Sequence, residues 1–339
     1  MPTGPRMRKR AIQLIGNDNG AGLTRDMRLV ARILREGGHQ VTVTRLNNRA
    51  RLSHRWQRFS GRARQLLRNL ARGRLHARYD LNLMCESVSA RYFRQAGASA
   101  LLPHPEWFDQ AWLADLGGID LVLAKTHHAQ RIFSELGRPV IHTGFVSEDQ
   151  RAPDIARQPT FFHGPGRSNN KGTAQILKLW ADHPDWPQLT VVWRSDEARA
   201  WPQTPANVRL IREYVGDEAL RELQNSSVFH LCPSQTEGYG HSIVESLGIG
   251  AVVISTDAEP MNELVTPEHG ILVAAHAAGT QALATLYDFD MDAMRAAIER
   301  CIHMPEAEQQ RLGQAARRWF EDNRRDFPGR LLRALDTLP

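Results

Sequence analysis

Short apolar runs alternate with helical patterns along most of this chain, and this alternation limits the possible folds more than any other feature. Each run is followed by a polar or glycine-containing loop, as the buried strands of a parallel sheet are. The runs cover residues 10–15, 39–46, 80–86, 99–104, 120–125 and 139–145 in the first half, and 160–164, 189–194, 207–215, 227–234, 251–256 and 270–274 in the second. The pattern predicts an α/β protein with doubly wound parallel sheets.

The 339 residues are enough for two domains of this type. A polar, proline-containing stretch follows Ser147 and predicts the link between them. We expect a first Rossmann-like domain over residues 1–148 and a second one over 158–305. The tail reads as helical from Thr280 onward, and we expect its last helices, over 306–339, to cross back to the first domain.

The charge is unevenly distributed between the two halves. Residues 1–150 hold 24 Lys and Arg against 12 Asp and Glu, although the net charge of the whole chain is only +6. This asymmetry predicts an anionic partner for the first half. Cys85, Cys232 and Cys301 have no metal or redox spacing, and no apolar stretch approaches the roughly 20 residues of a membrane span. We therefore expect a cytoplasmic protein without a secretory signal.

Most of the positive charge comes from an arginine-rich insert at about residues 45–78. No acidic residue occurs from Gly37 to Tyr79, and apolar residues recur there at helical spacing. Three interpretations stay open: a solvated helix face, a phosphate-binding surface for nucleic acid, or a helix that docks on an anionic membrane surface with Trp56 and Phe59. The insert matches no nucleic-acid motif, so we expect no nucleic-acid partner.

The densest chemistry lies in the segment PSQTEGYGHSIVESLGIG, residues 233–250. A strand leads into a loop with Glu237, where Gly238 and Gly240 allow tight turns and a close approach to a ligand. A helix is expected to begin near His241 and Ser242, and the free amides of its first turn form an anion site suited to a diphosphate. A capped helix with an acid in its first turns is the alternative interpretation.

This segment resembles the retaining glycosyltransferases of family four in the GT-B class. The resemblance rests on Pro233-Ser234, two glutamates separated by seven residues, and an acid before Leu-Val; the residues are Glu237, Gly238, Gly240, Glu245 and Glu263. It implies two Rossmann-like domains that face a cleft. It also implies that Glu237 is catalytic and faces the donor sugar, and that Glu245 binds the nucleotide ribose.

The loop HGPGRSNNKGT, residues 163–173, follows a strand and precedes a helix. The family places an arginine and a lysine at such a point to neutralise the donor diphosphate, and Arg167 and Lys171 fit these roles. Fixed cations there stabilise the charge that develops on the departing phosphate. An ordinary solvated turn is the alternative.

The first half holds a second glycine loop and a candidate catalytic histidine. Gly16, Gly20 and Gly22 resemble the loop with which the family closes over the donor, although their spacing does not match the dinucleotide fingerprint. Ligands of such sheets bind at the carboxyl ends of the strands. Several polar residues are expected there: Glu86, His104, Lys125, Thr126 and His142. Of these, His104 matches the histidine that the family often places in the cleft.

A pair of aspartates, Asp288 and Asp290, spells the metal-binding motif of a different glycosyltransferase fold. It precedes a helical pattern here, so we interpret Asp290 or Asp292 as a helix cap and expect no metal site.

These observations predict a glycosyltransferase. The resemblance implies transfer of a hexose-type sugar from a UDP- or GDP-sugar to a hydroxyl of a glycan or lipid-linked acceptor, with retention and without a metal or cofactor. The enzyme would be cytoplasmic or peripheral on the inner membrane face. A nucleotide-sugar epimerase of the same fold and a membrane-binding protein on an inactive scaffold are the alternatives.

Overall fold

The computed structural model describes residues 8–18, 20, 22–46 and 77–339. The chain forms two compact units, of which unit 1 contains Met1–Gly144 and Phe327–Pro339 and unit 2 contains Phe145–Asp326. Most of the arginine-rich insert lies outside the described residues, so the three interpretations of its function stay open.

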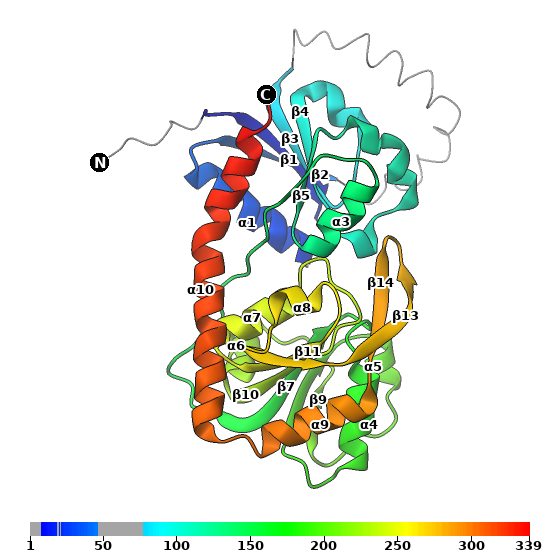
Figure 1. The fold of residues 1–339 in the computed structure, drawn as a ribbon, viewed down its shortest axis with the longest axis vertical. Helices are drawn as coiled ribbons and strands as arrows, with labels where there is room; N and C mark the ends of the chain where they lie inside the picture. The colour runs from blue at the N-terminus through cyan, green and yellow to red at the C-terminus, as the bar shows by residue number, and fades with distance from the viewer. Residues whose placement is uncertain (1–7, 19, 21, 47–76) are drawn as a thin grey trace. The chain divides into compact units, whose positions relative to one another are not determined.

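Unit 1 is built on a parallel sheet of six strands in the order β2-β1-β3-β4-β5-β6 (Figure 1). The strands are β1 (Ala11–Asn17), β2 (Gln40–Leu46), β3 (Tyr79–Cys85), β4 (Ala96–Leu102), β5 (Leu121–Ala124) and β6 (Val140–His142). Every pairing between neighbours is parallel. The reversal of strand order beside β1 is that of a doubly wound fold, as the sequence predicted.

Two α-helices of unit 1 cover its sheet, α1 (Gly22–Glu36) and α3 (His127–Glu135). Unit 1 also contains the 3₁₀ helices η2 (Ala90–Gln95), η3 (Pro105–Trp107) and η4 (Gln110–Gly118). The apolar residues of α1 recur at three- and four-residue steps and are buried, Leu23, Met27, Val30 and Leu34 among them. The helix ends where Gly37 N donates to Ile33 O and Gly38 takes a positive φ of 85°.

Unit 2 has a second parallel sheet of six strands in the order β12-β11-β10-β7-β8-β9. Its strands are β7 (Gln158–Gly166), β8 (Leu189–Trp193), β9 (Val208–Ile211), β10 (Ser227–Cys232), β11 (Val252–Thr256) and β12 (Gly270–Val273). Its helices are α4 (Thr173–Asp182), α5 (Asp196–Ala200), α6 (Asp217–Asn225), α7 (His241–Ile249), α8 (Met261–Leu264) and α9 (Met291–Ile302). Alternate residues of its strands, such as Phe161, pack against side chains of α4 and α9, such as Trp180 and Ile298, in a buried core.

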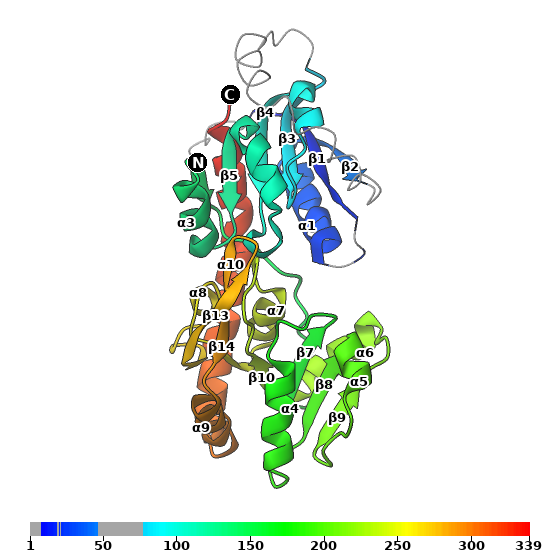
Figure 2. The same ribbon diagram turned by 90° about the vertical axis from the view of Figure 1, so that its right-hand side faces the viewer.

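One expectation for unit 2 was wrong. The helical tail does not start at Thr280, because β13 (Ala275–Gln281) and β14 (Ala284–Phe289) form an antiparallel hairpin on a sheet of their own, drawn in orange in Figure 2. The alanines of this segment favour a helix in isolation, but cross-strand pairing and contacts to neighbouring loops outweigh that preference. Helix α9 then begins after Asp290, whose carboxylate accepts from Ala293 N at 2.7 Å, so the predicted helix cap is confirmed.

The last helix, α10 (Glu306–Asp336), contains residues of both units, and Pro328 lies inside it. Within unit 1, Arg330 Nε donates to Thr143 O at 2.7 Å and Arg10 donates to Leu338 O at 2.5 Å. These two hydrogen bonds join the C-terminal residues to the rest of unit 1. Among the described residues, none of the helices combines the length and the apolar character of a membrane span.

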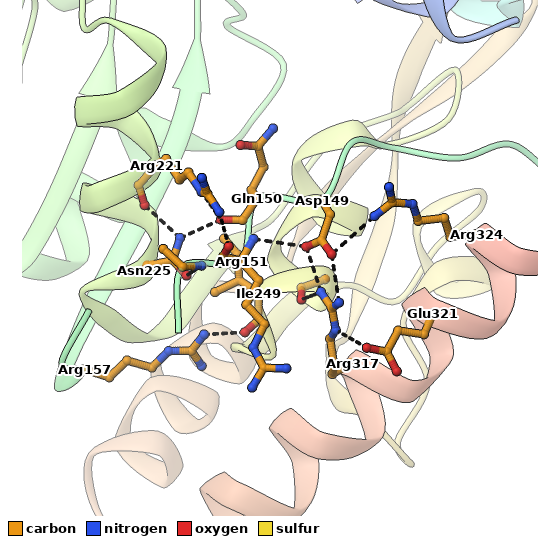
Figure 3. Close-up of polar contacts among 12 residues, drawn as sticks. Asp149, Gln150, Arg151, Arg157, Arg221, Asn225, Ile249, Arg317, Glu321 and Arg324 are labelled. Carbon is orange, nitrogen blue, oxygen red and sulfur yellow. Dashed lines mark hydrogen bonds and ion pairs between the residues drawn. The ribbon is translucent and has the colours of Figure 1, made fainter. Parts of the chain in front are cut away.

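The first residues of unit 2 are tied to its body by a polar network (Figure 3). Asp149 accepts from Arg317 at 2.7 and 2.8 Å and from Arg324 at 3.3 Å, both on α10. On the other side, Asn225 and Arg221 donate to Gln150 O at 2.8 and 3.1 Å. The polar stretch after Ser147 is therefore part of unit 2, and the division between the units falls at Gly144 and Phe145.

Candidate functional site

Two loops of unit 2 meet at the carboxyl end of its sheet. One follows β7 and carries Lys171, and the other follows β10 and carries Glu237. Because β7 and β10 are parallel neighbours, their carboxyl ends lie at the same edge of the sheet. The loops are joined directly, since Gln235 N donates to Asn170 O at 3.0 Å.

Lys171, Ser234 and Glu237 form a compact polar cluster at this meeting point. Lys171 makes an ion pair with Glu237 Oε1, and the same oxygen accepts from Ser234 Oγ at 2.6 Å. Lys171 Nζ also donates to Ser234 Oγ at 3.2 Å. The Lys171 and Glu237 side chains are only 16% and 12% exposed, so water screens their interaction weakly. The sequence had grouped Lys171 and Glu237 in one site, and the fold brings them into contact.

Helix α7 begins directly after this loop. Its N-cap, Gly240, has a φ of 100°, and a Cβ there would lie 2.8 Å from Leu264 Cδ1, so both backbone and packing require glycine. His241 and Ser242 are its first two residues, and His241 Nδ1 shares a hydrogen bond of 2.7 Å with Ser147 Oγ. The amides of this first turn point away from the helix body and can bind an anion.

The other residues predicted in unit 2 lie around this point in different environments. Glu245 is the fifth residue of α7 and is 7% exposed. Gly238 is buried in the loop after β10, and Arg167 is exposed in the turn that follows β7. His163, within β7, is a buried structural histidine that bonds to Leu231 O and Thr173 Oγ1, and burial lowers its pKa to about 4.

A second cluster occupies the carboxyl ends of the strands of unit 1. Glu86 follows β3, His104 follows β4 and Lys125 follows β5. His104 Nδ1 lies 3.3 Å from Glu86 Oε2, and its Nε2 lies 2.5 Å from Lys125 Nζ. The parallel strands thus bring together three residues that the sequence had placed at strand ends.

The fourth member of this cluster, Asp26 on α1, was not predicted. Asp26 makes an ion pair with Lys125, and its Oδ2 lies 3.3 Å from His104 Nε2. Asp26 and Lys125 are 1% and 2% exposed. Asp26 sits among the buried residues of an otherwise apolar helix face, and a buried acid of this kind needs a cation as partner. That position was the only sequence signal for it.

The cluster sets the charge of His104. Burial lowers the pKa of His104, as does the Lys125 charge, but the hydrogen bonds that the ring donates to the carboxylates of Asp26 and Glu86 outweigh both and raise the pKa to about 9. The two carboxylates therefore favour the protonated imidazole.

The predicted glycine loop follows β1. Gly20 has a φ of 63°, its amide donates to Thr24 Oγ1 at 2.9 Å, and Gly22 is the first residue of α1. Thr24 Oγ1 in turn donates to Asp18 Oδ1 at 2.7 Å and, as the main cause, lowers the pKa of Asp18. Asn19 and Ala21, between these positions, lie outside the described residues.

Residues 203–319 match the family described as Glycosyl transferases group 1. A relative from Xanthomonas campestris, GDP-mannose:cellobiosyl-diphosphopolyprenol alpha-mannosyltransferase, is 26% identical over 236 residues, which cover 63% of this chain and 61% of the relative. The chain thus spans about three-fifths of the length of this curated relative.

Solved structures resemble almost the whole chain. Sucrose-phosphate synthase from Thermosynechococcus elongatus aligns with a TM-score of 0.67 and 16% identity, over 98% of this chain and 100% of that one. A structure described as trehalose-6-phosphate from E. coli bound with UDP-2-fluoro glucose aligns with a TM-score of 0.68 and 12% identity, over 97% and 100%. The chain therefore has the GT-B fold that its sequence predicted, and its residues 203–319 match the glycosyl transferases group 1 family.

Proposed function

We propose that this protein is a glycosyltransferase that moves a hexose-type sugar from a nucleoside-diphosphate sugar to a hydroxyl group of a glycan or glycolipid. The cluster of Lys171, Ser234 and Glu237 carries this proposal, because it places a cation and a carboxylate side by side at the start of α7. Glu237 and Glu245 both lie within the residues that match the family.

The first task of such a site is to hold the donor diphosphate. When the bond between the sugar and the diphosphate breaks, negative charge builds up on the departing phosphate oxygen. Lys171 and the first amides of α7 offer positive charge at one place, and the bound phosphate replaces Glu237 as the partner of Lys171. Arg167 adds a second cation to the diphosphate.

The second task is to orient the sugar and the ribose. A carboxylate accepts hydrogen bonds from neighbouring hydroxyls, which suits Glu237 for the donor sugar and Glu245 for the ribose. The acceptor hydroxyl attacks on the face of the departing phosphate, which takes its proton, so the transfer proceeds with retention and needs neither a metal nor a cofactor. His104 of unit 1 is the second catalytic residue that we propose.

The name of the Xanthomonas relative suggests the first substrates to test. That protein is named for GDP-mannose as donor and for a sugar on a diphosphopolyprenol as acceptor. We propose a GDP-hexose donor and a lipid-linked glycan acceptor for this chain as well. A lipid-linked acceptor brings the enzyme to a membrane surface, where the positive charges of the arginine-rich insert attract anionic lipids.

Calorimetric titration of the purified protein with GDP-mannose, UDP-glucose, GDP and UDP tests donor binding. Mass analysis after incubation with a polyprenol-diphosphate glycan tests transfer, and incubation with the donor alone separates a transferase from an epimerase. We expect one nucleotide-sugar to bind and a hexose to be added to the acceptor. Conversion of the donor to its epimer without acceptor, or no binding by any nucleotide-sugar, would overturn the proposal.

A further inference from the structure

The β13–β14 hairpin contacts both loops that carry the polar cluster of unit 2. Asn170 Nδ2 donates to Gln281 Oε1 at 2.5 Å, at the end of β13. Gln235 Nε2 donates to Asp288 Oδ1 at 2.6 Å, on β14. The backbone adds a third bond, because Tyr287 N donates to Gln235 O at 2.9 Å. One hairpin therefore binds the loop after β7 and the loop after β10.

These contacts lie next to the residues proposed to bind the donor. Asn170 directly precedes Lys171, and Gln235 lies between Ser234 and Glu237. The hydrogen bond from Gln235 N to Asn170 O closes the network, so the two loops are tied to each other and to the hairpin. A shift of either strand of the hairpin therefore moves the backbone beside Lys171 or Glu237.

Packing at the base of the hairpin fixes the same loops. Phe289, the last residue of β14, is 5% exposed and lies against Gly172, the residue after Lys171. A Cβ at Gly172 would lie 2.7 Å from the Phe289 ring and 3.0 Å from Pro233 O. Phe289, Gly172 and the start of the Glu237 loop are thus closely packed.

The hairpin is poorly suited to a purely stabilising role. It is not part of the six-stranded sheet, and His276 to Thr280 on β13 are all exposed. An isolated two-stranded hairpin contributes little stability of its own. Its Gln281 and Asp288 side chains nevertheless contact the two loops of the site.

We infer that the β13–β14 hairpin positions Lys171 and Glu237. Gln281 and Asp288 are the positioning residues, because their hydrogen bonds to Asn170 and Gln235 fix the two loops. This inference rests on the proposed function of Lys171 and Glu237. Preorganised groups need little rearrangement when a charged ligand binds or a charge develops, and small misplacements of such groups reduce catalysis strongly.

The test compares variants that remove the two hydrogen bonds with variants that keep them. The acceptor oxygens are removed in Gln281→Ala, in Asp288→Ala and in the double variant. The conservative variants Gln281→Glu and Asp288→Asn each keep a side-chain oxygen that can accept the hydrogen bond. Thr280→Ala is the matched control, because Thr280 is exposed on the same hairpin and pairs only across the strands. Each protein is first shown to be folded by circular dichroism and its melting temperature.

Donor Kd, kcat and KM are then measured well below that temperature. We expect the double variant to lose about tenfold in donor affinity and at least as much again in kcat, with each single variant in between. The conservative variants and Thr280→Ala should stay within about twofold of the wild type. Wild-type Kd and kcat in the folded double variant would overturn the inference, as would an equal loss in Asp288→Asn.

Hydrogen exchange of the backbone amides keeps the test independent of turnover. In the double variant we expect faster exchange at Gln235 and across residues 170–173, without faster exchange in the β7–β10 strands. Unchanged exchange in these loops would also overturn the inference, even if the alanine variants fold poorly enough to obscure the kinetics. If the wild type binds no nucleotide-sugar, the proposed function fails, while the exchange data still show whether the hairpin fixes the loops.

Discussion

At the scale of single residues, Lys171 and His104 depend on their partners in different ways. Lys171 is paired with a single carboxylate, that of Glu237. His104 lies between the carboxylates of Asp26 and Glu86 and beside Lys125, and the two carboxylates raise its pKa. A bound phosphate would therefore compete with one carboxylate at Lys171, whereas His104 has several charged partners.

Replacement of Lys171 should weaken donor binding. We expect Lys171→Ala to raise the Kd for the nucleotide-sugar and for the free nucleoside diphosphate by about tenfold to a hundredfold, as the loss of a charge-assisted hydrogen bond does. Lys178→Ala is the control, because Lys178 is exposed in the second turn of α4, seven residues after Lys171. Calorimetric titration measures both, and equal affinity in the two variants would contradict the role of Lys171.

The charge of His104 should make stability depend on pH in a defined window. Its pKa is raised from 6.5 to about 9 in the folded protein, so the stabilisation is complete below pH 6.5 and disappears as the pH rises through about 9. The free energy of unfolding of the wild type should therefore fall over this range relative to that of His104→Gln. Chemical denaturation at several pH values measures the difference.

An NMR titration of the His104 ring gives a direct check of the same prediction. We expect a midpoint near 9 in the wild type and a lower one in Glu86→Gln, since that change removes one of the carboxylates that hold the proton. Asp26, Lys125 and Glu106 also act on the ring and stay in place in this variant. A midpoint at or below 6.5 in the wild type would contradict the charged state.

At the scale of elements, the start of α4 illustrates how packing and backbone conformation combine. Gly172 and Gly166 have almost the same φ, 62° and 63°, in the left-handed region. A Cβ at Gly172 would meet Phe289 and Pro233, whereas one at Gly166 would meet nothing within 4 Å. The two positions therefore separate the cost of strain from the cost of a clash.

We expect Gly166→Ala to cost about 1–2 kcal/mol of unfolding free energy, which is the usual penalty for this backbone region. Gly172→Ala should cost at least about 1 kcal/mol more, because β14 must also move. Denaturant unfolding of both variants measures the difference. Equal losses would show that β14 adapts without cost, and the hairpin would then not hold the loop firmly.

At the scale of the whole molecule, each unit binds its own chain ends together. In unit 1, Arg10 near the N-terminus donates to Leu338 O near the C-terminus. In unit 2, Asp149 near the first residue of the unit is held by Arg317 near its last, as Figure 3 shows. Contacts between residues so far apart in sequence join the two ends of each unit.

Replacement of Asp149 should destabilise unit 2. Burial raises the pKa of Asp149, but hydrogen bonds from Arg317 outweigh it and hold the pKa below 3.8. The contribution is therefore present above pH 3.8 and is lost as the pH falls below that value. We expect Asp149→Asn to cost about 1–3 kcal/mol near neutral pH, and the difference from the wild type to close in acid.

Asp322→Asn is the matched control on α10, because its pair with Arg325 is largely exposed and should contribute little. Thermal unfolding of both variants at neutral and acidic pH measures the effect. A larger loss in Asp322→Asn than in Asp149→Asn would contradict the importance of the network.

The sequence alone determined much of this protein. The periodicity of its apolar residues predicted two parallel sheets, because a buried strand and an amphipathic helix leave different patterns whatever surrounds them. The motif around Glu237 and the lysine at 171 predicted the GT-B fold. Such motifs can be recognised in the sequence because neighbouring residues specify a loop between a strand and a helix. The Asp290 cap is equally local.

Only the tertiary structure decided the contacts between distant residues. Asp26 joins Lys125 and His104 across 78 to 99 positions of sequence, and nothing in the residues around Asp26 identifies its partners. The residues from Thr280 to Phe289 were expected to be helical, but they pair in a hairpin that also bonds to Asn170 and Gln235. Local propensities amount to tenths of a kilocalorie per residue, whereas buried pairing and charge compensation are worth several times more, so tertiary contacts prevail wherever the two disagree.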